Sequence, residues 1–89
     1  MNDITEAPRM ERIQEINAQI QSNDKENERL RLVHQYGTEN VFDTQELGKR
    51  FEVIGFAAPF CLVVDRQTRV KGTIEFQHNP RLYFDFRPI

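Results

Sequence analysis

The sequence predicts an α+β protein in which helices precede an antiparallel β-sheet. Apolar residues recur at spacings of three and four in the N-terminal part, which is the period of an amphipathic helix. In the C-terminal third they alternate with polar residues, which is the period of a strand. The chain has 89 residues, the usual length of one domain. We therefore predict a single domain over residues 9 to 89, preceded by a disordered tail over residues 1 to 8.

The N-terminal region, residues 9 to 37, is expected to be helical and similar to a coiled coil in its apolar pattern. Pro8 suits the first turn of a helix, because the N–H that proline lacks has no partner there. Ile13, Ile16 and Ile20 follow on one helical stripe. Gly37 is suited to end the region, since glycine is the commonest residue after a helix.

The middle of this region allows two interpretations. Ser22, Asn23 and Asp24 are poor helix formers and good N-caps, so the chain either turns here into a helical hairpin or continues as one helix. A single helix over residues 9 to 36 would be about 42 Å long. In that case Asn23 and Asn27 are polar seam residues that fix the register between two chains.

A short helix is predicted over residues 43 to 51. Asp43 can accept a hydrogen bond from the first turn, and Glu46, three residues later, can complete a capping box. Gly48 weakens the prediction, because glycine in a helix interior costs about 1 kcal/mol relative to alanine.

The remaining segment, residues 52 to 89, is expected to form the sheet. Three strands, "PFCLVVD", "VKGTIEFQ" and "LYFDF", are joined by the turns "RQTR" and "HNPR" into a meander, and "EVIGFAAP" is a possible fourth strand at the edge. Strict alternation assigns Tyr83 and Asp85 to the solvent side. It assigns the following residues to inward-facing positions: Phe60, Leu62, Val64, Ile74, Phe76, Leu82, Phe84 and Phe86.

Composition restricts the class of protein. The net charge is −2, with 38% hydrophobic and 29% charged residues, as in an ordinary globular protein. No apolar run approaches the length of a membrane span, and the N-terminus has no basic segment followed by an apolar one. The single Cys61 cannot close an intrachain disulfide. These features predict a cytoplasmic protein without membrane association.

Catalytic chemistry is not expected. Cys61 lies within a predicted strand among apolar neighbours, which makes a thiol inert. His34 is on a helix and His78 is in a turn, so the sequence pairs neither with a nucleophile. One cysteine and two separate histidines do not make a metal site, and the glycines form no phosphate-binding loop. We predict no enzyme activity, cofactor, metal or small-molecule substrate.

The expected function is therefore binding to another protein. A long helix with a half-polar seam extends beyond a small sheet, and a second copy of the chain is the simplest cover for it. The predicted homodimer interface consists of Ile13, Ile16, Ile20, Asn23, Asn27 and Leu30. Small proteins without catalytic residues are frequent among phage and mobile-element products that block host enzymes or defence complexes. We accordingly expect a stand-alone inhibitor or adaptor of a larger macromolecular complex.

A nucleic-acid-binding regulator is the alternative. Residues 61 to 89 contain more basic than acidic side chains, although the chain as a whole is acidic. Basic and aromatic side chains together can hold phosphates and stack on bases. The candidate partner-binding residues, for protein or nucleic acid, are Arg66, Arg69, Lys71, His78, Arg81, Tyr83 and Arg87.

Overall fold

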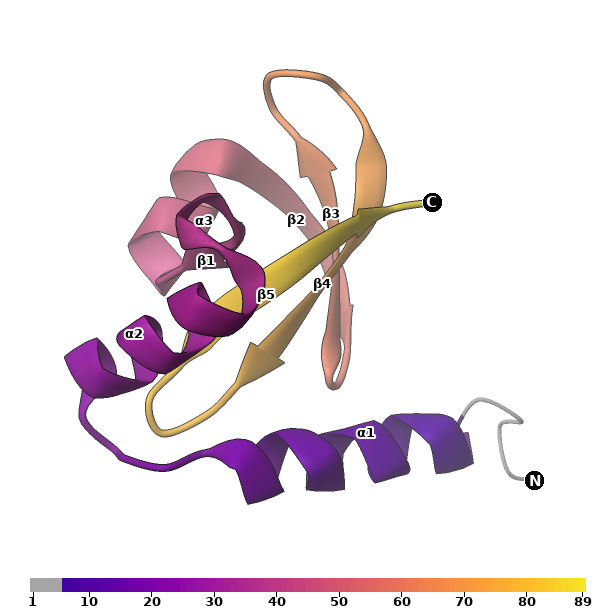
Figure 1. Cartoon of the computed structure of the whole chain (residues 1–89). Coiled ribbons are helices and arrows are strands. Elements are labelled where there is room, and N and C mark those ends of the chain that lie inside the picture. Colours follow the sequence, from indigo (N-terminus) through magenta and orange to yellow (C-terminus); the bar gives the residue numbers. More distant parts are fainter. Residues whose placement is uncertain (1–5) are drawn as a thin grey trace.

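The computed structural model describes residues 6–89 and has an α+β architecture of helices followed by an antiparallel sheet (Figure 1). The predicted fold class is confirmed. The predicted number of strands, three or four, is wrong, because the sheet has five. The elements in chain order are α1 (Glu6–Gln19), α2 (Lys25–Tyr36), the 3-10 turn η1 (Thr38–Asn40), β1 (Val41–Phe42), α3 (Thr44–Arg50), β2 (Phe51–Ala57), β3 (Phe60–Asp65), β4 (Lys71–Gln77) and β5 (Leu82–Pro88).

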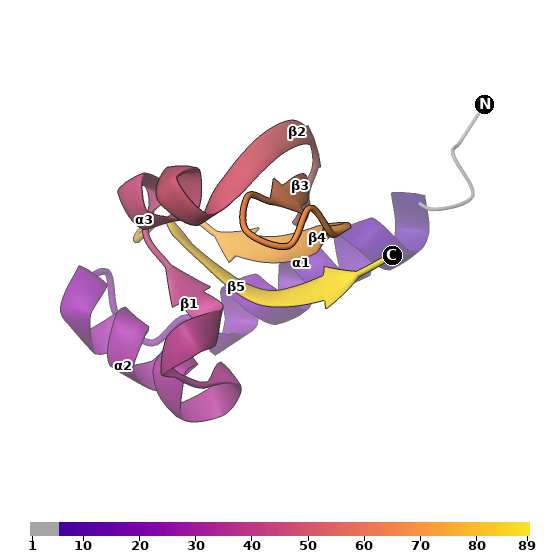
Figure 2. The same cartoon turned by 90° about the horizontal axis from the view of Figure 1, so that it is seen from above.

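The N-terminal helices are two and not one. Asp24 is the N-cap of α2, and its carboxylate accepts hydrogen bonds from the backbone N–H groups of Glu26 and Asn27 at 2.9 and 3.2 Å. The predicted break at residues 22 to 24 is therefore confirmed and the single long helix is wrong, but the two helices do not pack against each other as the predicted hairpin would. Both helices leave the break in different directions and each reaches the sheet (Figures 1 and 2). Residues 6 to 8 of the predicted tail belong to α1, and residues 1 to 5 lie outside the described residues.

Helix α3 forms where the sequence predicts a short helix. Asp43 and Glu46 make the expected capping box, in which each side chain accepts the backbone N–H of the other residue. The helix covers residues 44 to 50 and not 43 to 51, because Phe51 already belongs to β2. Leu47 is the buried residue of α3, so this helix attaches to the sheet through one apolar side chain.

The sheet has the order β1-β5-β4-β3-β2, and every neighbouring pair is antiparallel. Strands β2 to β5 form the expected meander, with β2 as the edge strand that the sequence allows. Strand β1 was not predicted: it is only two residues long and pairs Val41 with Phe84 and Phe42 with Tyr83. A two-residue strand carries too little alternation to be recognised from the sequence.

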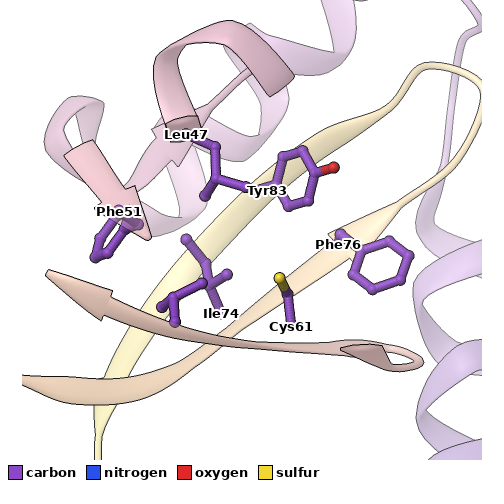
Figure 3. Close-up of a cluster of buried hydrophobic side chains, with 7 residues drawn as sticks. Leu47, Phe51, Cys61, Ile74, Phe76 and Tyr83 are labelled. Atoms are coloured by element: carbon purple, nitrogen blue, oxygen red, sulfur yellow. The ribbon is translucent and has the colours of Figure 1, made fainter. Parts of the chain in front are cut away.

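Both faces of the sheet are covered, each by its own apolar cluster. The first face, here called the α3 face, lies under α3 (Figure 3). Its buried residues are Leu47, Phe51, Cys61, Val63, Ile74, Phe76 and Tyr83. The opposite face, here called the helix-pair face, packs on α1 and α2. Its buried residues are Ile16, Leu32, Val41, Leu82 and Phe84.

Strand β5 departs from the predicted alternation. Tyr83 is opposite Phe76 and is only 3% exposed, so it belongs to the α3 face and not to solvent. Leu82 and Phe84 therefore point to the helix-pair face, away from Ile74 and Phe76. A single amphipathic sheet face was assumed, whereas the helices provide an apolar cover on both sides.

Two further residues explain the pattern at the end of β5. Asp85 has a positive φ of 63° and lies where the pairing with β4 shifts by one residue. This bulge returns Phe86 to the α3 face, where its ring stacks on Phe51 at a centroid distance of 5.0 Å. Phe86 thus lies on the same face as Ile74, as the sequence predicted, whereas Leu82 and Phe84 do not.

Strand β3 is also reversed relative to the prediction. Its fully buried side chains are Cys61 and Val63 on the α3 face, whereas Phe60, Leu62 and Val64 are half-buried on the other face. Alternation fixes which residues share a face, but it does not determine which face the helices cover more completely.

One ion pair and one hydrogen-bonded group attach the helices to the sheet. Arg12 of α1 donates to both carboxylate oxygens of Glu75 in β4, with 2.9 Å between Nη2 and Oε1. In α2, Glu28 is 1% exposed and accepts hydrogen bonds from Arg31 at 2.9 Å and from Gln77 at 3.1 Å. Each of these carboxylates is buried with its hydrogen-bond donors, which is the condition for a charge to be tolerated inside a protein.

The Glu28 site makes stability dependent on pH. Burial by itself raises the pKa of the Glu28 carboxyl, but hydrogen bonds from Arg31, Gln77 and the backbone N–H of Gln21 outweigh it and lower the pKa below its ordinary value. A carboxyl with a lowered pKa stabilises the fold above its unfolded pKa, and this stabilisation is lost as the pH falls through the folded pKa.

We expect the free energy of unfolding to decrease as the pH is lowered from about 6 to about 3, and Glu28→Gln to flatten this decrease. At pH 7 the substitution removes a charge-assisted hydrogen-bond partner of Arg31 and should cost about 1–3 kcal/mol. Urea unfolding at several pH values measures both effects. Glu39→Gln, at an exposed position, is the control and should keep the wild-type profile. An unchanged pH dependence in Glu28→Gln would contradict this role.

Two glycines provide a matched pair for the packing of the α3 face. A Cβ on Gly72 would lie 2.7 Å from Cζ of Phe86 and against the carbonyl oxygen of Arg87, whereas a Cβ on Gly48 would meet no atom within 4 Å. Gly72→Ala should destabilise the protein by about 1–3 kcal/mol through overpacking. Gly48→Ala in α3 should stabilise it by up to about 1 kcal/mol. Equal unfolding midpoints in urea for the two variants would contradict the packing described for β5.

Candidate protein-binding surface

The seven residues predicted to bind a partner lie at opposite ends of the sheet. One end contains the β3–β4 hairpin and the last residues of β5, and the other contains the β2–β3 and β4–β5 turns and α1 (Figure 1). The structure brings His78, Arg81 and Tyr83 together at the second end. Arg66, Arg69, Lys71 and Arg87 are at the first end, here called the basic end.

Arg81 is the centre of the group at the turn end. Its guanidinium carbon lies 4.5 Å from the ring centroid of Phe76, 5.3 Å from that of Tyr83 and 5.8 Å from that of Phe56. Its Nε donates to the Tyr83 hydroxyl at 3.0 Å, and its Nη1 is 3.2 Å from Nδ1 of His78. Arginine stacked on aromatic rings gains cation–π attraction in addition to its hydrogen bonds. We call these five residues the Arg81 surface.

The local fold explains why these side chains meet. The β4–β5 turn reverses the chain at Asn79, which has a positive φ of 54°, so that Arg81 returns over β4. Phe56 comes from β2, where it is opposite the small side chain of Cys61. The small residue between them allows the Phe56 ring to reach Phe76, with which it makes an edge contact at 5.7 Å.

The guanidinium of Arg81 has no carboxylate partner among the described side chains. Other half-buried arginines form ion pairs: Arg12 with Glu75 and Arg31 with Glu28. The hydrogen bonds that the described residues give Arg81 use Nε and Nη1 only. A positive charge held in one orientation, next to a Phe56 ring that is 58% exposed, is therefore presented at the surface.

An apolar cleft adjoins the Arg81 surface. It lies between α1 and the β2–β3 turn, encloses about 200 Å³, and shares Phe76 and His78 with the Arg81 surface. Its walls are Ile13, Ile16, Asn17, Ala58, Pro59, Phe76, Gln77 and His78. Arg9 of α1 donates from Nε to the carbonyl oxygen of Ala58, one of the wall residues, at 2.9 Å. The volume suits one large apolar side chain next to the Arg81 charge.

The basic end has a different character. Arg66 donates from Nε to the carbonyl of Gly48 at 3.1 Å, which places the hairpin beside the end of α3 with Lys49 and Arg50. Carboxylates partly neutralise the region. Arg50 pairs with Asp65 at 3.1 Å, and Arg87 pairs with Asp85 at 3.0 Å. The side chains of Arg66, Arg69 and Lys71 are exposed.

The predicted dimer residues do not form one continuous stripe. Ile16 is 4% exposed and packs in the chain's own core, while Ile13 and Ile20 are half-buried. Asn23, Asn27 and Leu30 are exposed on the break and on α2. A continuous helical seam is not available because the chain breaks between α1 and α2, so a dimer through these residues stays a prediction with fewer apolar contacts than expected.

The thiol of Cys61 is inaccessible in the folded protein. The residue is fully buried on the α3 face, and burial raises the pKa of its thiol, an effect that the Arg81 charge only partly opposes. Within residues 6–89 no group of three or more histidine, cysteine or acidic side chains is placed to hold a metal ion. The helices that the structure describes include none with the length and apolarity needed to cross a membrane.

Phe56 and the edge strand that carries it were missed as functional candidates. The segment "FEVIGFA" reads as a possible strand, but the alternation is interrupted by a shift of register between Val53 and Gly55. Three large apolar residues within four positions, Val53, Ile54 and Phe56, were the available signal, and their exposure can be recognised only once β2 is known to be an edge. Comparisons with models of protein families, with curated proteins and with solved structures found no match for this chain. Its function is therefore argued from its own surface.

The buried thiol gives a direct test of the α3 face. We expect Cys61 in the native protein to react with a thiol reagent only at the rate of unfolding, because the nucleophile is the thiolate and burial disfavours it. Time-resolved labelling, with and without urea, measures the rate. Labelling of the native protein as fast as a small free thiol would contradict the burial of this residue.

Proposed function

We propose that the chain is a small non-enzymatic protein-interaction module that binds a larger macromolecular complex as an inhibitor or adaptor, of the kind that phage and mobile elements direct against host-defence complexes. The observation that carries the proposal is the Arg81 surface. Arginine and aromatic residues are the types most enriched at the centres of protein interfaces. The cleft next to it gives the partner a place for one apolar side chain.

The chemistry of the surface defines the partner. The rings of Phe76 and Tyr83 already fix the orientation of Arg81. Binding of a carboxylate therefore does not carry the entropic cost of ordering a free side chain. The guanidinium favours a planar, bidentate anion. We therefore infer a partner segment in which an acidic residue is close to a large apolar one.

A homodimer remains part of the proposed function. The sheet and the helices leave apolar side chains exposed at several places, among them Leu30 on α2 and Phe56 on β2. A second copy of the chain is always available to cover these side chains, and twofold dimers are the commonest assemblies.

The proposed function is tested by affinity capture from lysate, followed by binding measurements with the purified partner. Arg81→Gln should weaken binding by about tenfold or more, as expected for the loss of a central charged contact. Arg69→Gln, an equal change of charge at the basic end, is the control and should bind as the wild type does. Equal binding by wild type and Arg81→Gln would contradict the role of the Arg81 surface.

Nucleic-acid binding is the second candidate function, and the clustering at the basic end favours it. Arg66, Arg69, Lys71 and Arg87 lie near each other and near Lys49. If these four predicted residues each neutralise a phosphate, the affinity for duplex DNA or RNA should fall with salt with a log–log slope of about −3.6. Arg69→Gln should reduce that slope, and Arg81→Gln should not. Absence of binding at low salt would remove this candidate.

A further inference from the structure

We propose that two copies of the chain join through their β2 strands, side by side and antiparallel, so that one sheet runs through both copies. The proposal deepens the homodimer in the proposed function and rests on it. It replaces a helical interface by a sheet edge, because the edge is where the structure leaves its largest group of neighbouring apolar side chains without cover.

Strand β2 is the long open edge of the sheet. The order β1-β5-β4-β3-β2 leaves β2 with one neighbour, so within residues 6–89 no strand pairs with the backbone groups on its outer side. The other edge is different, since β1 has only two residues and lies against α2 and α3. Helix α3 also contacts β2, and in Figure 2 β2 runs from the end of α3 along the side of the sheet opposite β1.

The β2 edge carries apolar residues that water would otherwise contact. Val53, Ile54 and Phe56 are 40%, 51% and 58% exposed. Edge strands that stay unpaired usually carry lysine, proline or inward charges, and β2 has only Glu52 as a charged residue. One bulge is present between Val53 and Gly55, and it bends the strand without adding charge.

The bulge determines how two β2 strands can pair. Val53 is opposite Val63 and Phe56 is opposite Cys61, so both lie on the α3 face although they are three residues apart. Residues directly opposite in an antiparallel pair must share a face. A twofold pairing that places Val53 opposite Phe56 of the second copy meets this condition, and two such apolar pairs form.

The same register also places residues of the same face opposite each other on the helix-pair side. It places Glu52 opposite Ala57 of the second copy, and both of these residues point to the helix-pair face, as their opposites Val64 and Phe60 show. No like charges are brought together. The strand is thus complementary to itself in this register, which a strand that binds unrelated segments does not need to be.

Charge at the two ends of β2 favours a second copy as the occupant. Antiparallel pairing brings the start of one strand, next to Lys49 and Arg50, beside the end of the other, next to Ala58. Helix α1 reaches this end through the hydrogen bond from Arg9 to Ala58 and carries exposed Glu11 and Glu15. Arg50 and Glu15 already pair with Asp65 and Arg12 within their own chain, so the charges that this pairing brings toward each other are Lys49 of one copy and Glu11 on α1 of the other.

The oligomeric state tests the proposal. Light scattering after gel filtration at micromolar concentration should give twice the chain mass of 10.6 kDa for the wild type. Ile54→Lys should give the monomer mass, because a lysine side chain opposes edge pairing. Leu30→Lys is the matched control on α2 and should remain a dimer. Circular dichroism checks that each variant is folded.

The outcomes separate this inference from the proposed function. A dimer that survives Ile54→Lys but not Leu30→Lys overturns the β2 interface and leaves the homodimer in place. A monomeric wild type overturns both the interface and the homodimer. Partner binding is tested separately with Arg81→Gln, which leaves β2 unchanged. Phe56 belongs both to the Arg81 surface and to the β2 interface, so it is not used to separate the two.

The register has its own test, which does not require a destabilising change. Glu52→Cys and Ala57→Cys chains should form a disulfide when they are mixed, since opposite residues in an antiparallel pair have Cβ atoms about 4.5–5.5 Å apart. Each variant alone should not, because its two new cysteines would be about 17 Å apart along the strands. Buried Cys61 does not compete. Equal cross-linking in the single variants and in the mixture would overturn this register.

Discussion

The packing of β5 on both faces of the sheet is the constraint on which the rest of the structure depends. Leu82 and Phe84 pack in the apolar cluster of the helix-pair face, and Tyr83 and Phe86 pack in that of the α3 face. The bulge at Asp85 makes this possible, because it changes the alternation by one residue. With both faces apolar, the three helices cover the faces and the β1 side, and among the described residues no further element covers the β2 edge.

The sequence was sufficient for the order and type of most elements but not for the sides on which residues lie. The capping residues Asp24 and Asp43 and the period of the helices are local signals, and they placed the helices within a few residues. The burial of Tyr83 depends on α3 packing over it, and the reversal after Asp85 depends on a single backbone angle. Neither the burial of Tyr83 nor the reversal after Asp85 can be recognised from the pattern of apolar residues.

The candidate site was predicted in part for the same reason. Among the predicted partner residues, His78, Arg81 and Tyr83 are close in sequence, and the turn brings them together. Phe56 joins them only through the order of the strands, which no local pattern contains. The result is a molecule with two candidate binding ends and one open edge: an aromatic and cationic end with a cleft, a basic end, and β2 between them.

The central claim is that the β2 edge is covered by a second copy of the chain, and amide hydrogen exchange tests it most directly. Strands β3 and β4 have neighbours on both sides in a monomer, so their protection should be independent of protein concentration. The outward amides of β2 should exchange slowly at high concentration and rapidly on dilution, as pairs between copies form and separate. Equally fast exchange of the β2 amides at all concentrations would contradict the claim.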